Sequence, residues 1–462
     1  MSTAVEESAP SIVERLDAAT AGPVHGPGDS GFDLSVAAFN SATVHRPAAV
    51  VVAAGAADVA AAVGIAAGAG LSVAVQSTGH GAAAVGPESI LINTQLLDFI
   101  AVDPQSRTAT VGAGVRWQQV LDAASPYGLG GLCGSAPGVG VVGYTLGGGI
   151  GPVARTFGFA ADHVVEIEVV TADGQLRRVS ENHDRDLFWA LRGGGGAFGI
   201  VTQITFRLFE IQTLHAGGMF FDYLDAPRVL HGWRDWAHQV PESVTSSVAV
   251  VNFPPLAAVP APLRGRTVLH LRFAHVSDTE DGEALLAPLR NLATPIVDTV
   301  TEIMYSDVGS IHADPTEPMP GAERSMLLRE LPVEAIDEFL ATVGPVGGLP
   351  LVFAEIRALG GALSRDAEVP NAVAGRDAAF SLFAVGVLAP PIADAVPGAL
   401  DSVLAAMEPW GTGGSLMNFA GTATDEHADR VRAAWAPQTR RRLTAVRDRF
   451  DPQGVFAAAA RW

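Results

Sequence analysis

The sequence predicts an α+β protein with two parts: a glycine-rich ligand-binding part made of α/β units, and a second domain with its own sheet. Strand-like and helix-like runs alternate from residue 46 and lead into a loop of small residues. Glycines gather in three clusters within the first 202 residues. From about His215 to Pro409, strand-like and helix-like stretches continue without such clusters, which is typical of a separate α+β domain.

The composition limits the classes of protein to which the chain can belong. A length of 462 residues and a hydrophobic content of 48% predict more than one domain and a large core. The formal net charge of -20 argues against nucleic acid as a partner, because a phosphate-binding surface requires concentrated positive charge. All 29 basic residues are arginine. The single cysteine, Cys133, excludes an internal disulfide and a cysteine-based metal cluster.

The N-terminal residues and the apolar runs predict neither secretion nor a membrane span. The first 20 residues contain early acids and no basic segment followed by an apolar run, so we expect a cytoplasmic protein. The apolar runs are interrupted by glycine, aspartate and β-branched clusters, and none provides an uncharged helix of about 20 residues.

The first glycine cluster follows a strand. Residues 46–54 indicate a buried strand, 56–70 a helix of small residues that ends at glycine, and 71–76 a second strand. The loop that follows, "STGHGAAAVG", contains one histidine, His80, and no carboxylate or cysteine. A loop at the carboxyl end of a strand is where α/β proteins bind ligands.

Two further glycine clusters share this first half of the chain. One is "GGLCGSAPGVGVVGYTLGGGIG" at 130–151, and the other is "RGGGGAFGIVT" at 192–202. A predicted hairpin, 163–180, lies between them. Glycines allow backbone to approach a planar or phosphorylated ligand closely, and successive N–H groups can bind a pyrophosphate. Three clusters in this order favour one shared ligand site over ordinary turns.

Several common site types do not fit the chain. No Gly-x-Gly-x-x-Gly opens a helix after the first strand with an acid about 20 residues further on, which leaves a Rossmann dehydrogenase as a weak competitor. A chain without lysine has no phosphate-binding P-loop. Gly-x-Ser-x-Gly is missing, which removes the usual support for a serine hydrolase. His80 has no ligand spacing around it, so we expect no metal site.

Read in order, the motifs resemble a known family. They are "STGHG", "GSAPGVGVVGYTLGGGIG" with "TFGFAADHV", "VTADGQ", "DLFWALRGGGGAFGIVT", and "MNF" followed by "FDPQGVF". This order is similar to that of the FAD-linked oxidases of the vanillyl-alcohol oxidase type, also called the PCMH type, in the berberine-bridge-enzyme-like branch. The resemblance implies a PCMH-type FAD-binding domain of two α/β subdomains. It also implies a substrate-binding domain built on an antiparallel sheet covered by helices.

The resemblance also implies domain limits. We expect an N-terminal lead-in at 1–41, the FAD-binding domain at 42–214 and the substrate-binding domain at 215–409. The segment 410–462 is expected to return to the FAD-binding domain.

The cofactor implied is FAD, bonded covalently through its 8α-methyl group to His80. A neutral imidazole nitrogen is a suitable nucleophile, and small neighbours permit the close approach. The family's usual arginine at the start of this loop is replaced by Gln76. The residues expected to contact FAD are Gln76, Ser77, Thr78, Gly79, His80, Gly81, Ala82, Ser135, Val139, Gly140, Gly143, Tyr144, Gly148, Gly149, Gly199, Ile200, Val201 and Asn418.

We expect a single covalent link. Some relatives add a second bond from a cysteine to flavin C6, and the corresponding residue here is Ala136. Cys133 lies three residues earlier, and a small half-buried thiol is its simplest interpretation.

The reaction implied is transfer of a hydride from an alcohol, sugar or natural-product carbon to flavin N5, with reoxidation by O2 to give H2O2. Relatives frequently carry a tyrosine two residues before Asn418, where this chain has Leu416. The candidate catalytic residues are therefore Tyr144, Tyr305, Glu355 and Arg357. Glu355 and Arg357 share one face of a strand by two-residue alternation, and either face the pocket or form a structural ion pair. "IMYSDVGSIH" and "TVLHLRF" offer His312, His270 and Arg272 as further polar groups.

Two other functions stay open. A flavin dehydrogenase would share every loop and pass electrons to another acceptor. A member of the family that has lost redox turnover would only bind or isomerise its ligand. The expected partners are a small organic substrate and O2, with no nucleic acid and no membrane, in a monomer or homodimer.

Overall fold

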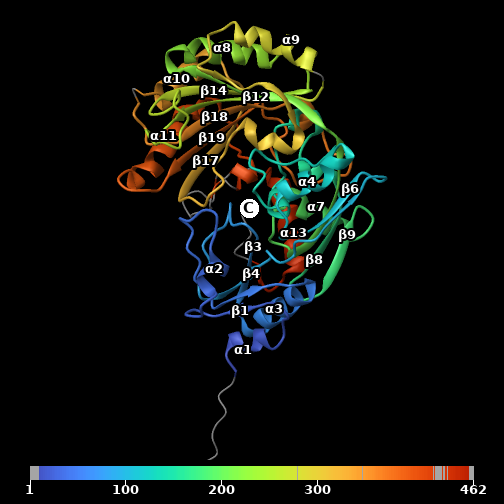
Figure 1. Cartoon of the computed structure of the whole chain (residues 1–462). Helices are drawn as coiled ribbons and strands as arrows, with labels where there is room; N and C mark the ends of the chain where they lie inside the picture. The colour runs from blue at the N-terminus through green and yellow to red at the C-terminus, as the bar shows by residue number, and fades with distance from the viewer. Residues whose placement is uncertain are drawn as a thin grey trace, which may run out of the picture.

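The computed structural model describes residues 10–456 apart from 278, 346, 420, 422–428, 430, 431 and 434. These residues form three large sheets and one two-stranded sheet, β7 (Leu129–Gly130) with β11 (Phe209–Glu210). In Figure 1 the first two large sheets lie in the lower part of the view and the third in the upper part. No helix in these described ranges is long and apolar enough to cross a membrane.

The first sheet has four strands and delivers the histidine loop. Its strands, in spatial order, are β1 (Val24–His25), β2 (Ala49–Val52), β4 (Ser89–Asn93) and β3 (Ser72–Gln76). β2, β4 and β3 are parallel, and β1 pairs antiparallel with β2. The helix α3 (Ala56–Ala69) connects β2 to β3, as the small-residue pattern predicts. The lead-in also contributes α1 (Ile12–Asp17) and α2 (Phe32–Val36).

The second sheet is antiparallel and has five strands. They are, in order, β5 (Ile100–Asp103), β6 (Thr108–Gly112), β10 (Ile200–Arg207), β8 (Val164–Val170) and β9 (Leu176–Ser180). The predicted β8–β9 hairpin is confirmed. The helices of this part are α4 (Trp117–Ala124), α5 (Val141–Leu146), α6 (Ala154–Phe157), α7 (Arg185–Gly194) and α13 (Pro437–Phe450). α13 packs on α7, so the C-terminal helix returns to this part of the molecule.

The third sheet has eight antiparallel strands and forms the upper part of Figure 1. Its strands are β12 (Thr213–Asp222), β13 (Val244–Asn252), β14 (Thr267–His275), β15 (Val297–Asp298), β16 (Thr301–Met304), β17 (Gly321–Leu328), β18 (Phe353–Ala358) and β19 (Phe380–Val387). Its helices are α8 (Ala226–Ala237), α9 (Thr279–Arg290), α10 (Val333–Val343) and α11 (Val396–Met407). They cover the outer face of the sheet, which confirms the expected antiparallel sheet covered by helices.

The two faces of this sheet differ in chemistry. Leu271 and Ile356 point outward into the apolar core beneath the helices. Their neighbours Arg272, Glu355 and Arg357 alternate to the other face and are buried there. A face that is buried and charged requires partners for its charges, and this face looks toward the glycine loops of the lower part.

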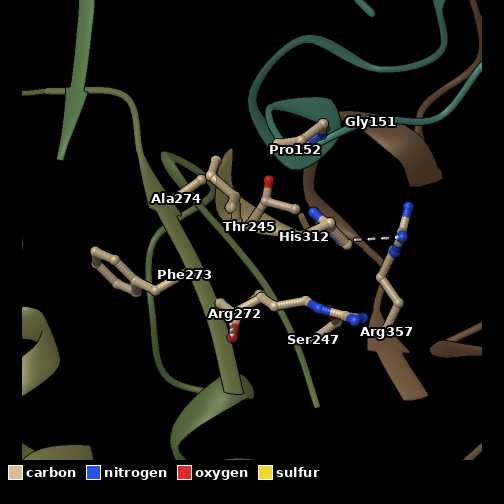
Figure 2. Close-up of a pocket in the computed structure, with 11 residues that line it drawn as sticks. Gly151, Pro152, Thr245, Ser247, Arg272, Phe273, Ala274, His312 and Arg357 are labelled. Carbon is tan, nitrogen blue, oxygen red and sulfur yellow. Dashed lines mark hydrogen bonds between the residues drawn. The ribbon is translucent and has the colours of Figure 1, made fainter. Parts of the chain in front are cut away.

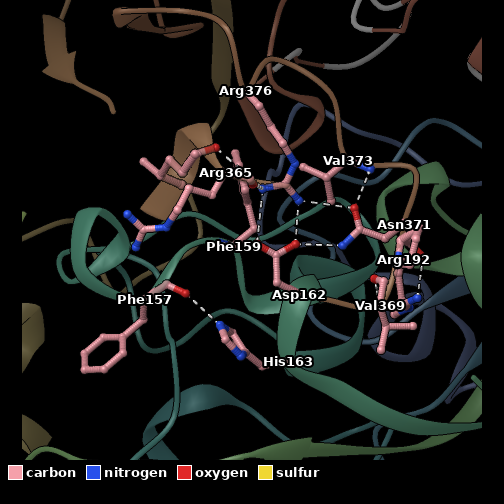
Figure 3. A network of polar contacts seen from close by, with 12 residues as sticks. Phe157, Phe159, Asp162, His163, Arg192, Arg365, Val369, Asn371, Val373 and Arg376 are labelled. Carbon is pink, nitrogen blue, oxygen red and sulfur yellow. Dashed lines mark hydrogen bonds and ion pairs between the residues drawn. The ribbon is translucent and has the colours of Figure 1, made fainter. Parts of the chain in front are cut away.

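A polar network joins the two parts of the molecule (Figure 3). Asp162 of the lower part accepts hydrogen bonds from Arg376 at 2.5 and 3.2 Å and from Asn371 at 2.7 Å. The guanidinium of Arg192 donates to the carbonyl oxygens of Val369 and Pro370. The loop 365–376 is therefore fixed to the third glycine cluster.

A second contact between the parts involves the lead-in. Met319 forms backbone hydrogen bonds with the lead-in. Its N donates to Phe39 O, and its O accepts from Ser41 N. The Asn40 side chain both donates to Gly321 O and accepts from Gly321 N. The lead-in thus pairs with the chain that enters β17.

We predict that Gly193→Ala destabilises the protein, because Gly193 has φ +105° and a Cβ there would lie 2.4 Å from Val373 N. The expected loss is about 2–4 kcal/mol in the free energy of unfolding. Gly196→Ala is the matched control, since a Cβ at Gly196 meets nothing within 4 Å, and its effect should stay within about 1 kcal/mol. Denaturant unfolding of both variants checks this, and equal stabilities would contradict the close approach at Gly193.

Candidate functional site

The histidine loop leaves β3 and is covered by the lead-in. The His80 ring stacks on Phe39 with ring centroids 3.8 Å apart and an interplanar angle of 13°. His80 Nδ1 lies 2.8 Å from Thr78 Oγ1. Gly79 has φ +75°, and a Cβ there would lie 2.7 Å from the Cα of Ala38. Glycine is therefore required at this position for the loop to pass beneath the lead-in.

The imidazole of His80 is neutral at physiological pH. Burial, with a smaller contribution from the nearby Arg116, lowers the pKa of His80 to about 4. Nε2 has no hydrogen-bond partner among the described residues, whereas Nδ1 is engaged by Thr78. A neutral imidazole with one uncommitted nitrogen is the nucleophile that attachment of a cofactor requires.

The side chain of Gln76 is used within the protein. Its amide nitrogen donates to Ala37 O at 2.8 Å, and its amide oxygen lies 2.9 Å from His45 Nε2. The residue is buried, so its side chain fixes the lead-in to the end of β3. Any contact of Gln76 with a ligand in this loop would come from its backbone.

The second glycine cluster faces the histidine loop. A Cβ on Gly140 would lie 3.2 Å from Ser77 Oγ and 3.7 Å from a methyl carbon of Thr78. Ser77 Oγ is buried and has no hydrogen-bond partner in the described part of the chain. An unpartnered hydroxyl between two glycine-rich loops fits a phosphate-bearing ligand.

Asn418 holds the turn at the end of this cluster. Its amide nitrogen donates to Tyr144 O at 3.0 Å, and its oxygen accepts from Gly149 N at 2.8 Å. A Cβ on Gly147 would lie 2.7 Å from the same amide nitrogen. Asn418 therefore fixes the backbone of the glycine turn with both ends of its amide.

The remaining residues expected to contact the cofactor lie on or beneath these loops. Ser135 and Val139 are half-buried, Gly143 and Gly81 are exposed, and Ala82 is half-buried. The buried members are Gly148 in the turn beside Asn418 and Gly199, Ile200 and Val201 at the start of β10.

Cys133 and two candidate tyrosines lie together in the core beneath the second cluster. Cys133 is fully buried, and burial raises the pKa of its thiol to about 12. The Tyr305 hydroxyl donates to Gly131 O at 2.8 Å and lies 3.9 Å from Cys133 Sγ. The Tyr144 hydroxyl is buried with no partner among the described residues, and burial raises its pKa well above the usual value. Arg357 is nevertheless close enough to Tyr144 to act on its hydroxyl electrostatically.

Glu355 and Arg357 form part of a buried charged cluster on the third sheet. Arg272 Nη1 donates to Glu355 Oε1 at 2.8 Å, and Arg357 Nη2 donates to Glu355 Oε2 at 3.1 Å. Burial alone would raise the pKa of Glu355, but Arg357 and Arg272 hold it well below its usual value. Glu355 and Arg357 thus form the ion pair that was one of the two interpretations of the sequence, and Arg357 also lines a cavity.

This cavity lies between the third sheet and the glycine turn (Figure 2). Arg272, Arg357 and His312 line one side, and Gly151 and Pro152 line the other. Gly151 follows the turn that Asn418 holds. The Arg357 guanidinium also lies 5.3 Å from the ring centroid of Phe419, the neighbour of Asn418.

Leu416 occupies an apolar position. It is buried in a small core with Ile150 and Leu327. The position that carries a tyrosine in many relatives therefore provides no proton acceptor in this chain.

Sequence reasoning missed two residues of the site, Phe39 and Arg116. Phe39 lies in the lead-in, 41 residues before its stacking partner, where no motif marks it. Arg116 precedes α4 and affects His80 through its charge. Its place between a strand and a helix was the one available signal.

Comparison with known proteins finds an FAD binding domain and FAD-linked oxidases as relatives. Residues 47–180 match the FAD binding domain family. The chain is 28% identical to (R)-6-hydroxynicotine oxidase of Paenarthrobacter nicotinovorans over 94% of this chain and 95% of the relative. Residues 47–180 therefore form an FAD binding domain, and nearly the whole chain is similar to an FAD-linked oxidoreductase.

Two solved structures share the fold of this FAD-linked oxidoreductase. The berberine-bridge-enzyme-like protein 1 of Physcomitrella patens superposes with a TM-score of 0.84, 20% identity and coverage of 96% of this chain and 97% of that chain. Glucooligosaccharide oxidase from Acremonium strictum superposes with a TM-score of 0.82 and 23% identity, and covers 96% and 98% of the two chains. The latter is described as carrying a 6-S-cysteinyl, 8α-N1-histidyl FAD.

We predict that Asn418→Asp weakens both the glycine turn and flavin retention in this FAD-linked oxidoreductase. The carboxylate can still accept from Gly149 N, but it places an oxygen against Tyr144 O in place of a donor. The expected cost is about 1–3 kcal/mol, read from thermal unfolding, with a lower flavin-to-protein ratio after gel filtration. Asn182→Asp, in an exposed loop, is the control and should leave both unchanged. If both variants have the same stability and flavin content, the hydrogen bonds of the Asn418 amide do not stabilise the turn.

Proposed function

We propose that this protein is an FAD-dependent oxidase of small organic molecules in which the flavin is attached covalently to His80. When bound, FAD accepts a hydride from a substrate carbon of an alcohol, sugar or natural product and is reoxidised by O2 to give H2O2. The observation that carries the proposal is the neutral, partly uncommitted imidazole of His80, in a loop that faces a second glycine cluster.

The residues around these loops fit such a cofactor. Ser77 Oγ is an unpartnered buried hydroxyl, and Gly140 leaves room beside it that a larger residue would fill. Asn418 holds the turn that ends at Gly149, close to the cavity on the third sheet. The loops would bind the cofactor, and the sheet would position the substrate against it.

A single attachment point is part of the proposal. Cys133 belongs to the second glycine cluster, but its thiol is fully buried, has a raised pKa and lies 3.9 Å from the Tyr305 hydroxyl. Position 136 carries alanine. A second, cysteinyl bond would require the core around Cys133 to open.

Among the proposed catalytic residues, Glu355 and Arg357 are favoured as the groups that face the substrate. Both belong to the cluster beside the cavity, and Arg357 lines it. Tyr305 is engaged by a backbone carbonyl oxygen. The ring of Tyr144 packs edge-on against Trp117.

Replacement of His80 tests the attachment. Acid precipitation of the purified protein should leave the yellow colour with the polypeptide, whereas His80→Ala should release its flavin into the supernatant. His183→Ala is the matched control, because His183 is exposed and distant from the loop in sequence, and it should retain the colour. Release of all flavin from the unmodified protein would contradict a covalent bond.

Reoxidation of the flavin separates an oxidase from a dehydrogenase without a known substrate. The flavin of the holoenzyme is photoreduced in the absence of oxygen with a sacrificial electron donor, the donor is removed, and the protein is mixed with aerated buffer. We expect rapid return of the oxidised spectrum with one H2O2 formed per flavin. A reduced flavin that persists in air but transfers electrons to a dye would show a dehydrogenase instead.

A further inference from the structure

The buried face of the third sheet carries unequal charges. Arg272, Arg357 and Glu355 are 4%, 5% and 2% exposed. Among the described residues, Glu355 is the only carboxylate that forms an ion pair with either arginine. The two arginines share this one carboxylate, so the three side chains together carry a net charge of +1. An uncompensated buried charge is costly to a fold, so a charge of opposite sign is expected to bind there.

The histidines of the cluster do not add to this positive charge. Burial and the nearby Arg272 lower the pKa values of His312 and His270, so both imidazoles are uncharged near neutral pH. Asp314 affects His312 electrostatically but forms no ion pair with either arginine of the cluster. The excess of positive charge is thus a property of Arg272 and Arg357 themselves.

Unpartnered hydrogen-bonding groups line the same cavity. Ser247 Oγ and His312 Nδ1 are buried and have no partner in the described part of the chain. His312 Nε2 lies 3.5 Å from Arg357 Nη2 and 3.6 Å from Glu355 Oε1, so the position of the imidazole proton depends on which of the two it pairs with. Figure 2 shows both residues beside Arg357, with Gly151 and Pro152 across the cavity. The Ser247 hydroxyl is therefore available as a donor to an anion.

We propose that this cavity binds a carboxylate of the substrate, which makes the substrate an organic acid such as a hydroxy acid, a sugar acid or an acidic natural product. The net charge of +1 on the cluster matches a monoanion. A guanidinium can bind a carboxylate through two parallel hydrogen bonds. The inference rests on the proposed function, because the cavity adjoins the glycine turn of the proposed FAD site.

Binding of benzoate, compared with its neutral analogue benzamide, tests the inference. The holoenzyme is titrated with each compound, and binding is followed by calorimetry and by the change in the flavin visible spectrum. We expect benzoate to bind at least tenfold more tightly than benzamide. Arg365→Gln is the control variant, because Arg365 is exposed and paired with Glu242, and it should bind benzoate as the unmodified protein does.

Two variants should change benzoate affinity in opposite directions. Arg357→Gln leaves Arg272 and Glu355 as a balanced pair, so it should fold and should bind benzoate at least tenfold more weakly. Glu355→Gln leaves both arginines without a carboxylate and should bind benzoate several-fold more tightly. A purely structural cluster would lose affinity in both variants, and circular dichroism reports whether each variant is folded.

Equal affinity for benzoate and benzamide, or unchanged benzoate affinity in Arg357→Gln, would overturn the carboxylate site. Failure of the proposed function would be seen differently, because the purified protein would then show no flavin absorbance. The cluster lies wholly within the third-sheet part of the chain, so calorimetry with benzoate still decides the inference in that case.

Discussion

The joint formed by Asn418 and Phe419 links the two halves of the site. Asn418 fixes the glycine turn through Tyr144 O and Gly149 N, while the Phe419 ring packs 4.7 Å from the ring of Phe383 on the third sheet. Two neighbouring residues therefore set the distance between the glycine loops and the sheet. The Phe419 ring also lies 5.3 Å from the guanidinium of Arg357, which lines the cavity.

Much of the fold could be predicted from the sequence, because its signals are local. The helix over 56–70 and the hairpin over 163–180 follow from periodicity and turn residues, and both are present as α3 and the β8–β9 pair. The order of the glycine motifs led to the FAD-binding fold. Alternation along β18 also placed Glu355 and Arg357 on one face, which the structure confirms.

The remainder of the site depends on contacts between distant segments. Glu355 on β18 pairs with Arg272 on β14 across the strand β13, which lies between them in the sheet. No motif in the sequence encodes that strand order. Tyr305 was a plausible catalytic residue in the sequence, but its short helix docks against Gly131 in the core of the other part. Gln76 stands where the family pattern has an arginine. Its amide bonds to the lead-in, and this contact is visible only in the folded chain.

The lead-in that covers His80 also has a consequence for the order of biosynthesis. Phe39 stacks on the imidazole, and its neighbour Asn40 is held by Gly321, about two thirds of the way along the chain. The cover over the histidine loop is therefore completed only after residue 321 has been synthesised, and the N-terminal segment alone cannot form it.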